Sequence, residues 1–176
     1  NLLDNSGSFG NTYSGAITGS GGLTLSGGAT LLTGQNTYTG GTDVQAGLLE
    51  VDGSVAGPVS VRSGAVLAGQ GSVGQTTVYS GASLLPGSTT AAGMLSATGN
   101  LKLEAGAMLL ANSVSSTQEL VHVTGNAHLL GGTVQILGSQ RLQYGESYTA
   151  LTAADGVTGQ YDAVNYVQHG DTPFIS

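Results

Sequence analysis

A short sequence unit recurs along this chain, and its spacing limits the folds that the chain can adopt. Each copy holds two alternating aliphatic or β-branched residues, then a Gly-Ala pair, then a Leu. The copies begin at positions 59, 76 and 101, so the second step is longer than the first. The equivalent residues are Val59, Val61, Gly64, Ala65 and Leu67, then Thr76, Val78, Gly81, Ala82 and Leu84, then Leu101, Leu103, Gly106, Ala107 and Leu109.

Steps of this length fit one turn of a parallel β-solenoid, whose successive turns hydrogen-bond to each other about 4.8 Å apart. The two-residue period of a strand puts Val59 with Val61, and Ala65 with Leu67, on one face, which we expect to be the core. Equivalent glycines fall at positions 28, 47, 64, 81 and 106. We expect Gly64 and Gly81 at corners of the coil, where a Cβ would oppose the backbone angles. The longer step predicts an extra loop of about eight residues within residues 86–97, where Pro-Gly-Ser-Thr-Thr is typical of turns.

Glycine interrupts almost every stretch long enough for a helix, so we expect an all-β chain with almost no helix. From about Glu119 the sequence changes, because five of the nine aromatic residues lie in the last 33 positions. Large rings fill a wider space than alanine can. The sequence therefore predicts a solenoid stem over residues 1–118 and a separate β-rich cap over residues 119–176.

The composition excludes several partners. Only three residues are basic and the net charge is −7, whereas neutralising phosphates requires clustered Lys and Arg, so nucleic acid is not an expected partner. Cysteine is absent, which excludes disulfides and thiolate metal sites. No apolar window reaches the roughly 18 residues of a membrane helix, and the chain opens at Asn1 without a leader, so we expect an internal piece of a longer protein.

Motifs for catalysis are weak. The run from Gly69 to Gly74 formally matches a dinucleotide-binding loop, but a strand rather than a helix is expected after it, which favours a turn. His122, His128 and His169 could supply a base for hydrolysis, yet no Gly-x-Ser-x-Gly motif is present, and His122 alternates with valines as on a solvated strand face. No spacing of ligands fits zinc or calcium. We predict no enzyme activity, no cofactor and no metal.

Threonine ladders leave a binding role open. Thr37, Thr39 and Thr42, or Thr76 and Thr77, could present hydroxyls to glycans or abiotic surfaces. The simpler interpretation is that they solvate the outer face of the solenoid.

Two segments carry a family resemblance. Residues 34–51 include Asn36-Thr37-Tyr38-Thr39-Gly40-Gly41-Thr42, followed by Val44 and Gly47-Leu48-Leu49. This run resembles the passenger-associated transport repeat of autotransporters. An upstream partial copy, Asn11-Thr12-Tyr13-Ser14-Gly15, precedes it. Residues 121–164, with Val121-His122-Val123-Thr124-Gly125-Asn126, Gly132-Thr133-Val134, Tyr144-Gly145-Glu146-Ser147-Tyr148 and Val157-Thr158-Gly159-Gln160-Tyr161, resemble the autochaperone junction that precedes the outer-membrane barrel of such proteins.

The resemblance implies a right-handed parallel β-helix at the bacterial cell surface or secreted from it, connected to an upstream passenger domain and a downstream outer-membrane β-barrel of the same parent chain. Its implied role is to nucleate folding of the passenger and so to aid export. Residues expected to form the folding cap are Tyr144, Tyr148, Leu151, Tyr161 and Val164, with Leu129, Val134 and Ile136 joining the cap to the last coils. Two alternatives stay open: an adhesin or self-association module that binds host surfaces or sister chains, and a stalk that presents an upstream enzyme such as a subtilisin-like protease.

Overall fold

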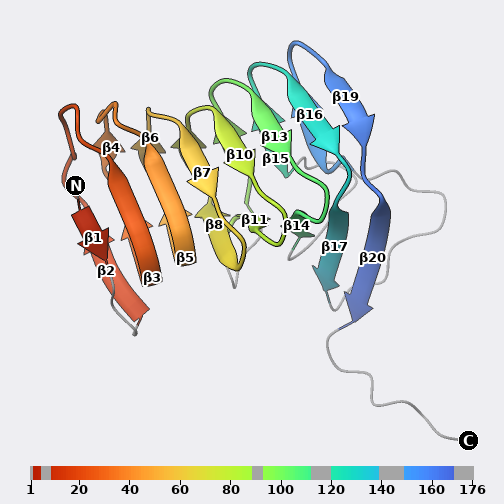
Figure 1. The fold of residues 1–176 in the computed structure, drawn as a ribbon, viewed down its shortest axis with the longest axis horizontal. Coiled ribbons are helices and arrows are strands. Elements are labelled where there is room, and N and C mark those ends of the chain that lie inside the picture. The colour runs from red at the N-terminus through yellow and green to blue at the C-terminus, as the bar shows by residue number, and fades with distance from the viewer. Residues whose placement is uncertain (1, 5–8, 89–92, 112–119, 139–148, 169–176) are drawn as a thin grey trace, which may run out of the picture.

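The chain folds into short strands that stack as successive coils from the N-terminal to the C-terminal end (Figure 1). The computed structural model describes residues 2–4, 9–88, 93–111, 120–138 and 149–168. Within these ranges there is no helix, and so none that could cross a membrane. The prediction of an all-β chain is confirmed.

Each full coil has three faces. Face 1 holds the first halves of the long strands β3 (Leu23–Leu32) and β5 (Thr42–Val51), and then β7 (Val59–Val61), β10 (Thr76–Val78), β13 (Leu101–Leu103), β16 (Ala127–Leu130) and β19 (Val157–Gln160). Face 2 holds the second halves of β3 and β5, and then β8 (Ala65–Gly69), β11 (Ser83–Pro86), β14 (Met108–Ala111), β17 (Thr133–Gly138) and β20 (Ala163–Gln168).

Face 3 is the six-stranded sheet of β4 (Gln35–Asn36), β6 (Ser54–Val55), β9 (Ser72–Val73), β12 (Leu95–Ala97), β15 (Val121–Val123) and β18 (Leu151–Ala153). At the N-terminal end, β1 (Leu2–Asp4) and β2 (Phe9–Tyr13) both pair with β3. Every ladder between these strands is parallel, so the chain is a parallel β-helix. Its right-handed sense stays a prediction, based on the strong preference of parallel crossovers for that hand.

The pairing register agrees with the sequence repeat residue by residue. Val59 pairs with Thr76, which in turn pairs with Leu101. On face 2, Leu84 pairs with both Leu67 and Leu109. The alignment of the three copies therefore identified the true vertical neighbours.

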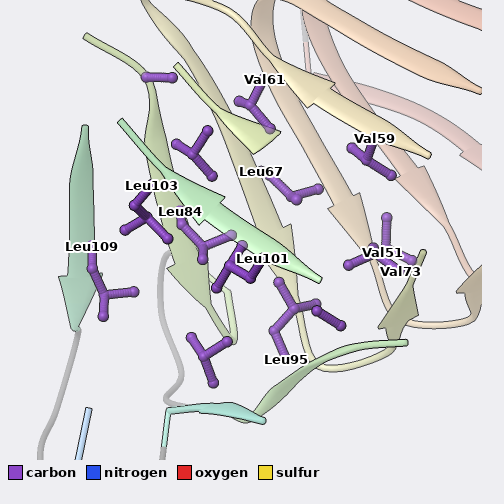
Figure 2. Close-up of a cluster of buried hydrophobic side chains, with 14 of the residues drawn as sticks. Val51, Val59, Val61, Leu67, Val73, Leu84, Leu95, Leu101, Leu103 and Leu109 are labelled. Atoms are coloured by element: carbon purple, nitrogen blue, oxygen red, sulfur yellow. The ribbon is translucent and has the colours of Figure 1, made fainter. Parts of the chain in front are cut away.

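The inward positions form one continuous core, part of which is shown in Figure 2. Side chains from all three faces meet there, for example Val61 from face 1, Leu84 from face 2 and Val73 from face 3. The core extends from Leu23 to Ile136. The core continues past residue 119, because β12, β13 and β14, which precede that residue, pair with β15, β16 and β17, which follow it. A stem and a cap divided at this residue stay a prediction.

The corner between faces 1 and 2 has the predicted glycine geometry. The glycines at positions 28, 47, 64, 81 and 106 all have φ between 74° and 83°, a range that L-residues rarely adopt. The predicted extra loop is also confirmed by the register. Ser83 pairs with Val66, whereas Ser96 pairs with Ser72. The chain therefore takes a longer path from Ser72 to Ser96 than from Val66 to Ser83, and the additional residues lie between Ser83 and Ser96.

The two copies of the transport-repeat motif lie on different faces of the coil. The upstream copy beginning at Asn11 is not the structural equivalent of the motif at Asn36, because β2 lies beside Thr30 to Leu32 on face 2. The position one coil before Asn36 is instead Ile17, whose carbonyl accepts a hydrogen bond from the Thr37 amide.

The threonine ladders are only partly at the surface. Thr37, Thr39 and Thr77 are exposed or half-buried, but Thr42 and Thr76 are buried. Each of these two opens a face 1 strand at an inward position, and its hydroxyl is satisfied locally. The Thr76 hydroxyl donates to the carbonyl of Gly74 over 2.9 Å.

Candidate functional site

The glycine-rich run from Gly69 to Gly74 is a corner and not a nucleotide loop. It contains the end of β8, the two-residue strand β9 and the turn into β10. No helix follows, so no helix N-terminus faces a phosphate. The interpretation of this motif as turn and strand is confirmed.

The histidines do not form a hydrolytic site in the described residues. His122 lies half-buried between the buried Val121 and Val123, so its ring points outward, as predicted. His128 is exposed on face 1. His169 lies outside the described residues. In the ranges that the structure covers, no three His, Cys, Asp or Glu side chains come together in a way that could hold a metal ion.

The predicted cap residues fall into distinct environments. Leu129 on β16, with Val134 and Ile136 on β17, is buried in the common core. Leu151 and Tyr161 are half-buried and pack against that core. Tyr144 and Tyr148 lie outside the described residues. Five of the eight predicted cap residues therefore lie in the last two described coils and belong to the common core or pack against it.

Val164 is exposed, although a residue of the predicted cap is expected to be buried. It pairs with Val134 and so occupies the same inward column, but 65% of its surface is exposed. Val157, which pairs with the buried Ala127, is 46% exposed. Both side chains are exposed because no described strand continues the ladder beyond β19 and β20.

The Tyr161 hydroxyl is the one buried side-chain polar atom without a hydrogen-bond partner among the described residues. Burial raises the pKa of Tyr161 to about 12. A buried hydroxyl that lacks a partner has lost its bonds to water without replacement. This group is a local weakness in the last coil.

Side-chain hydrogen bonds attach this last coil to the coil before it at three places. On face 3, His122 Nδ1 lies 3.1 Å from Thr152 Oγ1. On face 1, the ring of His128 is bonded to the Thr158 hydroxyl. Near the corner between faces 1 and 2, the Gly132 amide donates to the Asp162 carboxylate over 2.8 Å. The sequence does not reveal these bonds, because the partners are far apart in the chain and only the register makes them neighbours.

The segment that resembles a transport repeat has buried polar contacts. Asn36 Oδ1 accepts a hydrogen bond from the Ile17 amide, and Asn36 Nδ2 donates to the Gly34 carbonyl. The Tyr38 hydroxyl lies 2.5 Å from Thr42 Oγ1. Burial raises the pKa of Tyr38, and the hydrogen bond with Thr42 opposes that rise. These residues close the turn between β4 and β5 and attach it to the preceding coil, so their visible role is structural.

The fold and these contacts define the class of the chain as a parallel β-helix with a single apolar core. No protein-family model matches it. It is similar to an extracellular serine protease of Serratia marcescens, with 33% identity over 136 residues, or 72% of this chain. The chain spans only 13% of the length of that protein. The similarity therefore concerns a small part of an extracellular protein.

Proposed function

We propose that the chain is the non-catalytic stem and folding end of a secreted autotransporter passenger. It acts at the bacterial surface, between an upstream passenger domain and a downstream outer-membrane barrel of the same parent chain. Two sequence segments with the corresponding resemblance, the β-helix fold and the similarity to part of an extracellular protein support this proposal. The observation that carries it is the continuous parallel ladder that joins the strands of residues 120–136 to the earlier coils.

The mechanism follows from the ladder. If the C-terminal coils fold first, β15, β16 and β17 offer edges in the register that β12, β13 and β14 need. Each added coil gains backbone hydrogen bonds and buries aliphatic side chains without closing a long loop. A folded coil is too wide to return through an export pore, so folding biases movement outward without nucleotide hydrolysis.

Two leucines of one column provide the test. Leu25 and Leu129 both point inward on face 1, near opposite ends of the core. Loss of either side chain costs about 2 to 4 kcal/mol of folding free energy. In the parent protein, Leu129→Ala should reduce surface display more strongly than Leu25→Ala. Equal display of the two variants, or a larger loss with Leu25→Ala, would contradict a C-terminal nucleus.

A second candidate function is the presentation of an upstream enzyme. The observation that favours it is the similarity to a small part of an extracellular serine protease. In this case the parent chain should show proteolytic activity that stays with the upstream segment after residues 1–176 are removed by limited proteolysis. Activity that remains with the 176-residue chain would contradict both this function and the non-catalytic role.

A further inference from the structure

A groove runs along the outside of face 1 near its N-terminal end. It has a volume of about 560 Å³ and is lined by residues of three successive coils. Because neighbouring coils are about 4.8 Å apart, the lining spans about 10 Å along the axis. None of the predicted cap residues lines this groove.

Glycine pairs leave one part of the groove without side chains. Gly21 and Gly22 in one coil lie beside Gly40 and Gly41 in the next. A Cβ on Gly22 would lie 2.9 Å from the carbonyl oxygens of Gly40 and Gly41, so the coils approach closely only because these residues are glycines. This part of the lining is therefore backbone alone, so a ligand can contact it without displacing side chains.

The polar lining comes from outward positions of face 1. Thr24, Asp43 and Ser60 are vertical neighbours in the ladder, one in each coil. Arg62 lies beside them, with its Nε 2.7 Å from Asp43 Oδ1. Two hydroxyl groups and one carboxylate therefore line one column at intervals of one coil, with the guanidinium of the third coil beside it.

The charged pair is held in place before any ligand arrives. Asp43 also accepts a hydrogen bond from Gln45 Nε2 over 3.1 Å, and the Arg62 guanidinium lies 4.5 Å from the centre of the Tyr79 ring. Burial raises the pKa of Asp43, but hydrogen bonds from Arg62 and Gln45 outweigh it and lower the pKa below its usual value. Asp43 thus stays ionised, and its charge is balanced by Arg62.

We propose that this groove binds an extended, uncharged oligosaccharide. A balanced carboxylate and guanidinium offer an acceptor and a donor together, which suits adjacent sugar hydroxyls better than it suits an anion or a cation. The repeat of the coils is close to the advance per sugar along an extended β-1,4-linked chain. Side chains fixed in advance lose little conformational entropy on binding. This inference does not depend on the folding role, because it concerns the opposite end of the solenoid.

Titration of the 176-residue chain with cellohexaose, followed by ¹H–¹⁵N correlation spectra, tests the proposal. Saturable shifts are expected at the amides of Gly21, Gly22, Gly40 and Gly41. Maltohexaose, whose chain is curved, and hexagalacturonate, which is anionic, should each bind at least about tenfold more weakly. No saturable shift with cellohexaose, shifts confined to other coils, or tighter binding of either control sugar would overturn the proposal.

Matched variants locate the site. Asp43→Asn should weaken cellohexaose binding about tenfold, because it removes a charged acceptor. Lys102→Gln changes another ion pair on the same face, Lys102 to Glu104 at 3.1 Å, with similar exposure, and should leave binding unchanged. Ser60→Tyr, which fills the groove and keeps the Asp43 carboxylate, should abolish binding. The same spectra report whether each variant is folded. Unchanged binding in folded Asp43→Asn and Ser60→Tyr would overturn the assignment.

Discussion

His128 Nδ1 and Thr158 Oγ1 lie 2.7 Å apart, although they are distant from each other in the chain. They are vertical neighbours on the outside of face 1, where β16 pairs with β19. Together with the bonds of His122 to Thr152 and of Gly132 to Asp162, this contact attaches the last described coil to the one before it.

Loss of the Thr158 hydroxyl should therefore loosen the last coil selectively. Thr158→Val keeps the shape of the side chain and removes the hydroxyl's bonds to His128 and to the Ala127 carbonyl, at a cost of about 0.5 to 1.5 kcal/mol for each bond. Native-state hydrogen exchange should show faster exchange in β19 and unchanged exchange in β5 to β8. Thr77→Val, at the equivalent position in β10, is the control, because Thr77 has no side-chain hydrogen bond to other described residues. A loss of protection spread evenly over all coils would contradict this view.

The buried Asn36 should be more important than its size suggests. The next two residues of its column, Val55 and Val73, are apolar, so Asn36→Val fits the column but leaves the Ile17 amide without its acceptor. We expect a loss of about 1 to 3 kcal/mol in the free energy of unfolding, measured by urea denaturation.

The reverse substitution provides the control for this prediction. Val55→Asn puts an amide into the same column without the irregular turn around Ile17, and it should destabilise the chain at least as much. If Asn36→Val stabilised the chain, the proposed bond between coils would be unimportant.

Two tyrosines should respond in opposite ways to loss of their hydroxyls. Tyr161→Phe removes a buried hydroxyl that has no partner among the described residues and should raise the midpoint of urea unfolding. Tyr38→Phe removes the hydrogen bond to Thr42 and should lower it. Shifts of the same sign would contradict these assignments.

The stability of the chain at alkaline pH provides a second test of the burial of Tyr161. Its pKa in the folded chain, about 12, is above the value of about 10 expected after unfolding. Its contribution to stability is therefore fully present below about pH 10 and is lost as the pH rises towards about 12. Tyr161→Phe should flatten the pH dependence of stability in this window. An unchanged alkaline profile would show that the ring is not buried.

Two corner glycines distinguish backbone strain from steric clash. Gly47 and Gly64 have nearly the same positive φ, so alanine at either position costs about 1 to 2 kcal/mol in strain. A Cβ on Gly64 meets nothing, whereas a Cβ on Gly47 would clash with the Gly28 carbonyl oxygen. Gly47→Ala should therefore lower the melting temperature clearly more than Gly64→Ala. Equal effects would indicate that the coils are further apart than the structure shows.

The sequence was sufficient to predict the coil, because a solenoid repeats one local environment. Val59, Thr76 and Leu101 occupy equivalent positions in sequence and in space, and glycines mark the same corner in five coils. The irregular parts were not predictable in this way. The motif at Asn11 looks like that at Asn36 but lies on another face, since local sequence does not fix the register of the first coils.

The candidate sites depend on neighbours that are distant in sequence. Nothing near Asp43 indicates that Arg62 is its partner, and nothing near His128 indicates Thr158. Both pairs arise only when coil lengths and register are known. Thr42 and Thr76 are expected on the outer face but are buried. A hydroxyl that forms a local hydrogen bond can occupy an inward position.

Pulse-labelled hydrogen exchange during refolding of the 176-residue chain tests the central claim most directly. If the C-terminal coils are the template, amides of β15, β16 and β17 become protected first, followed by β12 to β14 and then by β3 to β8. Protection that begins in β3 and β5, or that arises in all coils with one rate constant, would contradict nucleation at the C-terminal end.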